Sequence, residues 1–530
     1  MLVSRRSRIA LSTLLVATLG LAGCASSGGT SDKPAAASLT IGGYEPDHLT
    51  PGRTLSGYLP AQALFSPLTF VDAQGEISMI AAESVSSSDA ITWTIELKPD
   101  WTFHDGTPVT AQDYVDSWNA VAYGPNAWAG NGSMSGIQGY ADLNTADGQP
   151  ATAEMSGLEV VDETTFTVTL SSPEGQFPVQ LSQNMPAFYP MPAQAFEDPE
   201  AYDSMPIGNG PFEMTDPRQA NESFTVTAYE DFAGEKPGVQ EYIFKPYVDL
   251  GAAYTDAQAG NLDILTVPQD KVTVASSDFP DHLRTSDIPG TSYMAFPMDD
   301  PRFADIRVRQ AFSMAIDRDA VNEAVFAGSY HPATAWTSPA EPGTPDGVCA
   351  EFCEFDPEAA RTLLAEAGGL SGTVELIVGP GPNVEWEAYA NQLRQNLELD
   401  DVILTPATDY PAFLGARASG EMAGPFSSGW YPPYPSQQNT LRSVFTPGGI
   451  CMGCSQGLDP AVEAAITAAD SQLDPKDAEA GYAEAQEIIA KTFPVAPLFN
   501  MTITFIVSDK VADLAVSAGY LVLPRVTAAP

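Results

Sequence analysis

The stretch from Trp101 to Asn119, WTFHDGTPVTAQDYVDSWN, constrains the fold most, because several kinds of local structure meet there. Residues 104–106, HDG, predict a turn, and Thr110 with Asp113 three residues later predicts a capped helix start. A strand with one buried face is predicted just before it, from apolar residues that alternate with polar ones at Ile91, Trp93, Ile95 and Leu97. Strand, turn and helix in this order indicate a mixed α/β chain.

The size and charge of the chain narrow its class. At 530 residues it is too long for one hydrophobic core, and about 150 residues per domain predicts about three units. The net charge is −45, from 68 acidic and 23 basic residues. Nucleic acid is therefore excluded as a partner, because phosphates require a basic surface. The acidic residues are interpreted as a solvated, self-repelling surface.

The amino terminus predicts export. Three arginines within residues 5–8 precede an apolar run at 9–19, and the small residues of LAGC end at Cys24. This pattern predicts a signal peptide over residues 1–23 and a lipid-modified Cys24, as in bacterial lipoproteins. Residues 24–37 are small and polar, which predicts a flexible tether. Acyl chains on Cys24 would anchor the protein, and no later segment reaches the roughly 18 apolar residues that a membrane span requires.

Further motifs follow one another along the chain. They are YEPDHLTP at 44–51, LFSPLTFVDAQG at 64–75, PIGNGPFEM at 206–214, DIRVRQAFSMAIDR at 305–318 and GWYPPYPSQQNTL at 429–441. With the segment at 101–119, they resemble, in the same order, the motifs of the extracellular solute-binding protein family 5. Members of this family serve peptide and nickel ABC importers.

The resemblance implies a two-lobe α/β fold of the periplasmic-binding-protein type II (cluster C) with an extra subdomain. Lobe I would comprise 38–65, 205–291 and 496–530, the extra subdomain 66–204, and lobe II 292–495. The chain would cross between lobes near Phe296 and near Pro494. Gly208 and Gly210 of the return to lobe I are expected to adopt backbone conformations closed to other residues, and Pro211 to stiffen the exit.

The resemblance also implies where a ligand would bind. Candidate ligand-binding residues lie in the loop after the first strand, in the subdomain, in the 206–214 motif and in the 429–441 motif: Tyr44, Glu45, Trp128, Asn209, Gly429, Trp430, Tyr431 and Tyr434. Aligning the last motif puts Pro433 where peptide-binding members carry an aspartate for the peptide ammonium. A buried ammonium without a partner costs several kcal/mol, so Glu45 or another residue would have to replace that aspartate. Packing roles stay open for Trp128 and for the Trp430 loop.

The implied function is that of a monomeric, lipid-anchored binding protein. It would capture peptides between its lobes, deliver them to ABC permease subunits, and need no cofactor. A non-peptide solute, namely an oligosaccharide, a metal chelate or a modified peptide, is the alternative, and an extracellular hydrolase and an adhesive surface lipoprotein are more remote ones. The histidines at 48, 104, 282 and 331 lack metal-ligand spacing, and the chain has no nucleophile-elbow or phosphate-loop motif.

Four cysteines remain besides Cys24. They form the close pairs Cys349 with Cys353 and Cys451 with Cys454, and extracytoplasmic cysteines are expected to be oxidised. Of three possible pairings, we favour the two local disulfides. A four-cysteine zinc site and a redox CxxC stay open as alternatives.

Overall fold

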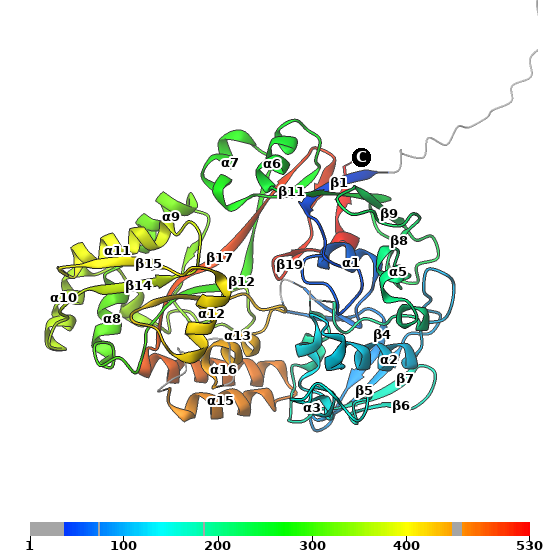
Figure 1. Cartoon of the computed structure of the whole chain (residues 1–530), viewed down its shortest axis with the longest axis horizontal. Helices are drawn as coiled ribbons and strands as arrows, with labels where there is room; N and C mark the ends of the chain where they lie inside the picture. The colour runs from blue at the N-terminus through cyan, green and yellow to red at the C-terminus, as the bar shows by residue number, and fades with distance from the viewer. Residues whose placement is uncertain (1–36, 73–74, 184–185, 448–457, 530) are drawn as a thin grey trace, which may run out of the picture. The chain divides into compact units, whose positions relative to one another are not determined.

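The largest element of the fold is a mixed sheet of eleven strands. The computed structural model describes residues 37–72, 75–183, 186–447 and 458–529. The strands follow the order β15-β14-β16-β12-β17-β11-β1-β10-β9-β8, and β13 pairs with β17 off this path (Figure 1). Their bounds are β1 Ser38–Tyr44, β8 Phe212–Met214, β9 Phe224–Ala228, β10 Glu241–Tyr247, β11 Ile264–Thr266, β12 Leu283–Ala295, β13 His331–Pro332, β14 Val374–Val378, β15 Val402–Pro406, β16 Phe426–Trp430 and β17 Val495–Val507.

Two long strands connect the two halves of this sheet. β12 and β17 have 13 residues each and pair with each other in antiparallel fashion (Figure 1). The pairing covers Leu283–Asp287 and resumes at Thr291 after a register shift. Pro289 lies within the interruption and has no N–H to donate to a partner strand. The interruption therefore separates the part of the β12–β17 ladder in one half of the sheet from the part in the other half.

The half of the sheet from β11 to β8 carries one hydrophobic core. Leu39 and Ile41 of β1, Tyr242 of β10 and Phe505 of β17 belong to it. β1 runs parallel to β10 and β11, so the carboxyl ends of these three strands lie at the same edge. The remaining elements of this half are α1 Tyr58–Leu64, α5 Pro199–Ser204, α6 Leu250–Gln258, η4 Gln269–Lys271, α7 Val272–Asp278, β18 Val511–Asp513, β19 Val516–Ser517, β20 Tyr520–Leu521, η6 Leu523–Arg525 and β21 Thr527–Ala528.

The half from β15 to β12 carries a second and larger core. It includes Trp336, Leu376, Phe426 and Ile489, which are fully buried. The helices of this half supply much of it: α8 Ile306–Met314, α9 Arg318–Phe326, η5 Ala350–Cys353, α10 Pro357–Glu366, α11 Val384–Asn396, α12 Tyr410–Ser419, α13 Gln437–Phe445, α15 Pro460–Asp470 and α16 Pro475–Thr492. The chain enters this half through β12 and leaves it through β17.

Between α1 and α5 the chain forms a third unit with its own core. Its sheet has the order β4-β5-β7-β6, and α2 packs against β6 and β7. The predicted capped helix is confirmed: Thr110 and Asp113 form a reciprocal capping box at the start of α2. The elements are β2 Thr69–Val71, β3 Ile77–Met79, β4 Ala82–Ser86, β5 Thr92–Leu97, α2 Ala111–Ala122, η1 Gly124–Asn126, η2 Asn131–Met134, α3 Tyr140–Leu143, β6 Leu158–Val160, β7 Thr165–Thr169, α4 Phe177–Gln180 and η3 Ala193–Phe196.

One expectation about backbone conformation was wrong. Gly208 and Gly210 are not among the glycines with positive φ, so neither adopts a conformation closed to other residues. A Cβ at either position would instead overlap the backbone of Leu64. Close approach of two backbone segments therefore accounts for these glycines.

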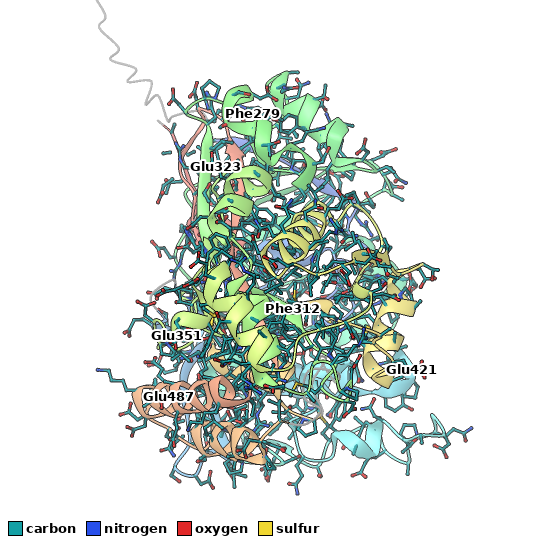
Figure 2. The ribbon with its side chains drawn as sticks, turned by 90° about the vertical axis from the view of Figure 1, so that its left-hand side faces the viewer. Phe279, Phe312, Glu323, Glu351, Glu421 and Glu487 are labelled. Atoms are coloured by element: carbon teal, nitrogen blue, oxygen red, sulfur yellow. A yellow bond between two sulfur atoms is a disulfide. The ribbon has the colours of Figure 1, made fainter. Side chains whose placement is uncertain are left out.

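Many acidic residues lie at the surface, whereas Asp203, Asp263, Glu341 and Asp470 are buried. Figure 2 shows Glu323, Glu351, Glu421 and Glu487 at the periphery, whereas Phe312 lies in the interior and is fully buried. Within the described residues, no helix is long and apolar enough to cross a membrane. In the same ranges, no group of three or more histidine, cysteine or acidic side chains is placed to hold a metal ion.

Candidate ligand-binding site

A cavity of about 410 Å³ lies at the edge where the parallel strands end. In open α/β sheets, ligands bind at the carboxyl ends of the strands. We call this space the strand-end cavity. It is lined chiefly by Ile41, Gly43, Tyr44, Leu55, Tyr58, Phe224, Phe244, Lys245, Pro246, Ile264, Ile503 and Leu521. Tyr44, a predicted ligand-binding residue, therefore lies at the cavity.

Strand register explains why the cavity wall is apolar. Gly43 lies opposite Pro246, and Ile41 lies opposite both Phe244 and Ile264. Side chains alternate along a strand, so these residues share one face of the sheet. Among the described residues lining the cavity, Lys245 is the one charged side chain, and its Nζ lies 2.6 Å from Oδ2 of Asp256. Its charge is therefore balanced within the protein.

Three tyrosines connect this cavity to the other half of the sheet. We call Tyr58, Tyr520 and Tyr431 the tyrosine bridge. The rings of Tyr58 and Tyr520 meet edge to face with centroids 4.8 Å apart, and those of Tyr520 and Tyr431 are 5.6 Å apart. The Tyr431 hydroxyl donates to the carbonyl oxygen of Ala518 at 3.0 Å. Burial raises the pKa of Tyr431, so its hydroxyl stays protonated. The predicted residue Tyr431 thus contacts the carboxyl-terminal segment that also lines the cavity.

Gly429 and Trp430 end strand β16. They pair with Ser292 and Thr291 of β12, directly beside the interruption in the β12–β17 ladder. The indole Nε1 of Trp430 donates to Oδ1 of Asn439 at 2.7 Å, and the half-buried ring packs against the second core. Trp430 is therefore held in place from two sides.

Tyr434 contacts a different part of the molecule. It is 6% exposed and packs with Val71 and Val179 of the third unit. Its hydroxyl donates to Oε1 of Gln438 at 2.7 Å, and Nε2 of Gln438 donates to Glu174 at 2.6 Å. In this structure Tyr434 joins two units of the chain and does not line the strand-end cavity.

At this contact the partly buried carboxylate of Glu174 interacts electrostatically with the buried carboxylate of Asp470. Arg442 pairs with Asp470, and the backbone N–H of Gly175 donates to the carbonyl oxygen of Asp470 at 2.5 Å. Burial, and secondarily the negative charge of Asp470, raise the pKa of the Glu174 carboxyl. Burial also raises the pKa of Asp470, against the effect of Arg442. This junction of the third unit with the second half therefore favours a proton on one carboxyl group.

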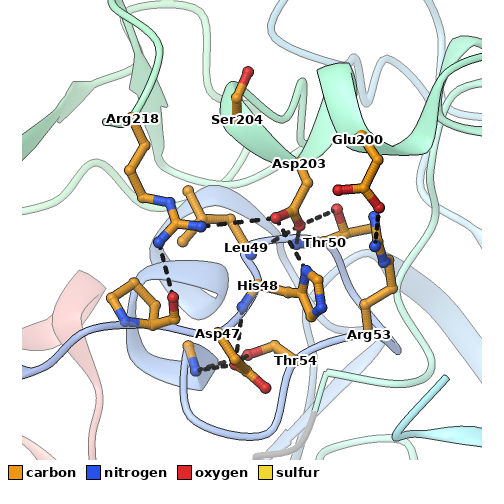
Figure 3. Close-up of polar contacts among 12 residues, drawn as sticks. Asp47, His48, Leu49, Thr50, Arg53, Thr54, Glu200, Asp203, Ser204 and Arg218 are labelled. Atoms are coloured by element: carbon orange, nitrogen blue, oxygen red, sulfur yellow. Dashed lines mark hydrogen bonds and ion pairs between the residues drawn. The ribbon is translucent and has the colours of Figure 1, made fainter. Parts of the chain in front are cut away.

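The loop that follows Tyr44 is held by carboxylates (Figure 3). Asp203 accepts hydrogen bonds from the N–H groups of Leu49 and Thr50 at 3.0 Å and lies 3.1 Å from Nδ1 of His48. Asp47 accepts bonds from within the loop, including the N–H groups of residues 55–57. Burial opposes the ionisation of Asp47, but these bonds hold its pKa below the ordinary range. The loop is therefore fixed before any ligand arrives.

Glu45, the proposed replacement for the missing aspartate, lies in this loop. Its Oε1 accepts a hydrogen bond from Arg218 at 2.8 Å. Its Oε2 is buried and has no hydrogen-bond partner among the described residues. Arg218 also donates to the carbonyl oxygen of Pro46 at 2.8 Å. One carboxylate oxygen of Glu45 is thus engaged with a cation of the protein.

Trp128 and Asn209 do not line the strand-end cavity. Trp128 is half-buried and packs against the cores of the third unit and of the first half. Asn209 is fully buried, and its Oδ1 accepts the N–H of Ser66 at 3.0 Å. Both positions remain predictions as ligand contacts.

The turn residue His104 has a role that local sequence did not indicate. Its Nδ1 accepts the N–H of Gly208, and its Nε2 lies within hydrogen-bond distance of the carbonyl oxygen of Gly210, both at 3.1 Å. These partners define the neutral ring with its proton on Nε2. Burial lowers the pKa of His104 to about 4. The ring therefore fixes the 206–214 crossover in its neutral form.

A second cavity of about 320 Å³ lies elsewhere. It is lined by aromatic rings that include Trp101, Tyr189 and Phe232, and the Arg525 guanidinium lies 4.0 Å from the centre of the Phe70 ring. Of the eight predicted ligand-binding residues, Tyr44 lines the strand-end cavity, and the other seven line neither cavity.

One predicted cysteine pair falls within the described residues. Cys349 and Cys353 are placed as a disulfide, with Cα atoms 5.6 Å apart. Cys451, Cys454 and the lipidation candidate Cys24 lie outside the described residues.

Sequence reasoning missed Tyr58 and Tyr520 of the tyrosine bridge, as well as Gly43. Tyr58 and Tyr520 lie far apart in the chain, and neither belongs to a motif used above. Gly43 carried a signal, since a glycine inside a strand often marks a close approach to the backbone.

These features define the class of protein. Residues 76–450 match the family described as "Bacterial extracellular solute-binding proteins, family 5 Middle". The chain belongs to this family of binding proteins, and its fold is the predicted two-lobe α/β fold of periplasmic-binding-protein type II. We use lobe I for the half that contains β1, lobe II for the half that contains β16 and extra subdomain for the third unit. The bounds expected for these parts from the sequence remain predictions.

Particular relatives are peptide-binding proteins of the periplasm. The chain is 29% identical to the periplasmic murein peptide-binding protein MppA of Escherichia coli K12 over 484 residues, which is 86% of each chain. It is 25% identical over 451 residues to the periplasmic oligopeptide-binding protein OppA of the same organism, covering 82% of this chain and 81% of OppA. The solved unliganded open form of MppA aligns with a TM-score of 0.79 and 26% identity, over 90% of this chain and 94% of that one.

Proposed function

We propose that this protein is the substrate-binding lipoprotein of an ABC importer, which captures peptides between its lobes and delivers them to a membrane permease. The observation that carries the proposal is the tyrosine bridge. It links Tyr431, beside the end of β16, to the wall of the strand-end cavity in lobe I. A ligand seated there would contact both lobes. The protein would bind and release its ligand without chemical change.

The long strands support a hinge mechanism. β12 and β17 connect the lobes, and their ladder is interrupted between Asp287 and Thr291. The carbonyl oxygen of Ile288, within the interruption, accepts a hydrogen bond from Ser338 of lobe II at 2.9 Å. Bending of a few residues at such a point can swing one lobe against the other. A ligand shifts this equilibrium only by the difference between its affinities for the open and closed states.

Peptides are the proposed ligands because the named relatives bind peptides. Pro433, at the position of the motif's ammonium-binding aspartate, favours one refinement of this class. A modified peptide, as in the murein peptide-binding relative, is therefore the second candidate. A modification that removes the ammonium would leave no charge for the missing aspartate to neutralise.

The proposed location is the outer face of the cell membrane. Acylation of Cys24 would hold the protein there, and residues 24–37 would give the binding unit reach toward its permease. The protein is proposed to act as a monomer. Mass spectrometry of the intact protein from its host tests the anchor, because acyl chains add a defined mass at Cys24. Secretion into the medium with an unmodified Cys24 would refute it.

Native mass spectrometry of the chain without its first 24 residues, followed by denaturing extraction, tests the ligand class. A ladder of extracted masses that sequence as peptides is expected. A single mass containing a non-standard amino acid or linkage would favour the modified peptide. A sugar or a metal chelate would refute peptide capture.

Removing an exposed aromatic ring at the cavity tests the site. Tyr44 is 62% exposed and lines the strand-end cavity, so its ring can be removed with little loss of stability. For a peptide identified by extraction, Tyr44→Ala should weaken binding about tenfold in calorimetry, as for an aromatic contact at an interface. Tyr410→Ala is the matched control, since Tyr410 is 57% exposed on α12. Equal affinities of both variants would contradict the assignment.

A further inference from the structure

The strand-end cavity has a chemistry that narrows the ligand further. Its volume of about 410 Å³ exceeds the roughly 150 Å³ of an apolar cavity that accepts benzene. Its floor is the sheet face that carries Ile41, Phe244 and Ile264. The rings of Phe224 and Phe244 stack on that face with centroids 5.1 Å apart. The cavity is thus large enough for an aromatic side chain, and its floor is apolar.

The one charged side chain that lines this cavity, Lys245, and the Ser56 hydroxyl are already engaged. Lys245 pairs with Asp256, which also accepts the Tyr247 hydroxyl at 2.6 Å. The Ser56 hydroxyl lies 3.0 Å from Oδ1 of Asp47. An acidic or basic ligand group that entered here would lose its hydration without gaining a free counter-charge.

The mouth of the cavity exposes apolar surface. Tyr44 and Leu55 both line the cavity, and each is 62% exposed. Large apolar side chains that stay exposed at the rim of a cavity mark a surface that a ligand covers. The exposed rim and the apolar floor therefore both favour an apolar ligand group.

Gly43 keeps the floor open. It lies in β1 opposite Pro246, and a Cβ at this position would meet no atom within 4 Å. Its φ lies outside the left-handed region, so other residues can adopt its conformation. The backbone conformation does not require glycine at residue 43. The missing side chain therefore leaves volume free in the cavity.

We propose that the strand-end cavity is a specificity pocket for one bulky apolar side chain of the bound peptide, with Gly43 as the residue that keeps it deep. The pocket rests on the proposed peptide-binding function. Peptides with Phe or Leu at the position that reaches the pocket bind more tightly than those with Ala there, and those with Glu or Lys bind more weakly.

The test uses tetrapeptides of alanine in which each position in turn is Phe, Glu or Lys, titrated calorimetrically into the full chain in detergent. One Phe peptide is expected to bind at least about tenfold more tightly than tetra-alanine, as for the burial of a Phe side chain. Gly43→Leu should abolish this gain. Gly43→Ala, which adds a single methyl group, should reduce the gain partially and covers the case in which the leucine variant does not fold.

Gly379→Leu is the matched control, because a Cβ at Gly379 of lobe II also meets no atom within 4 Å. It should keep the full preference for Phe. Equal binding of Phe and Glu peptides at every position, or an unchanged Phe preference in both Gly43 variants, would overturn the pocket while leaving peptide capture intact. Binding of none of the tetrapeptides by any variant would refute peptide capture, and the pocket with it.

Discussion

The neutral form of His104 should make the stability of this protein fall under mild acid. The ring accepts the N–H of Gly208 at Nδ1, and its Nε2 lies 3.1 Å from the carbonyl oxygen of Gly210. Protonation would place a second N–H against that amide and break the bond. The ring also packs edge to face on Tyr229, with centroids 5.0 Å apart.

The magnitude follows from the pKa of the ring. Burial lowers the pKa of His104 from 6.5 to about 4. The folded protein therefore binds fewer protons than the unfolded chain between these values, and the free energy of unfolding decreases as the pH falls from 6.5 toward 4. At about 1.4 kcal/mol per pKa unit, the loss reaches about 3 kcal/mol and then levels off. Such a loss is a large share of the stability of a typical domain.

His104→Gln isolates this effect, because a glutamine amide can accept and donate the same bonds without titrating. Urea unfolding of both proteins from pH 7 to pH 4 should show a steeper decrease for the wild type. The carboxylates titrate alike in both and cancel in the difference. His331→Gln, at a side chain 60% exposed, should behave as the wild type.

Proton NMR provides a direct check of the same reasoning. The imidazole signal that disappears in His104→Gln should titrate below pH 5 in the wild type. A midpoint near 6.5, or equal pH dependence of unfolding in the two proteins, would refute the structural role of the neutral ring.

Two further predictions concern the junction at Glu174 and the close approach of two backbone segments at Gly208. Burial and the charge of Asp470 raise the pKa of Glu174, so its contribution to the free energy of unfolding is present at low pH and lost as the pH rises above 4.5. Glu174→Gln should therefore gain about 1 kcal/mol or more over the wild type in urea unfolding at pH 8, whereas the exposed Glu487→Gln should not; equal values would contradict the buried pair. Gly208→Ala should cost about 2 kcal/mol or more, because its Cβ overlaps the backbone of Leu64, whereas Gly132→Ala, where a Cβ meets nothing, should melt as the wild type does; similar melting temperatures would refute the close approach.

Local chemistry made part of the fold predictable. The capping box of Thr110 and Asp113 depends on residues three positions apart, and it forms as predicted. Strand β5 likewise follows from the alternation of apolar residues before Trp101. The order of motifs along the chain identified the family and, through it, the two-lobe fold.

Contacts between residues far apart in the chain could not be predicted from the sequence. Tyr58, Tyr431 and Tyr520 meet because three separate segments converge, and no periodicity records this. His104 looked like a turn residue because its backbone forms a turn, while its ring binds a segment 104 residues away. The glycines of the crossover were attributed to their φ values, although the space beside Leu64 decides them.

The chemistry of the candidate site explains how an acidic protein can bind without charged anchors. A net charge of −45 attracts cationic ligands, but the field of exposed charges is screened within about 8 Å at physiological ionic strength. The net charge therefore acts while a ligand approaches the protein, before the ligand is bound. Retention in the proposed site would depend on what touches the ligand. There Lys245 is paired with Asp256 and Glu45 with Arg218, and the resemblance aligns Pro433 with an aspartate. With the nearby charges engaged, the free-energy difference between ligands comes from apolar area buried at about 25 cal/mol per Å². In the proposed pocket, the apolar lining of the strand-end cavity would supply that area.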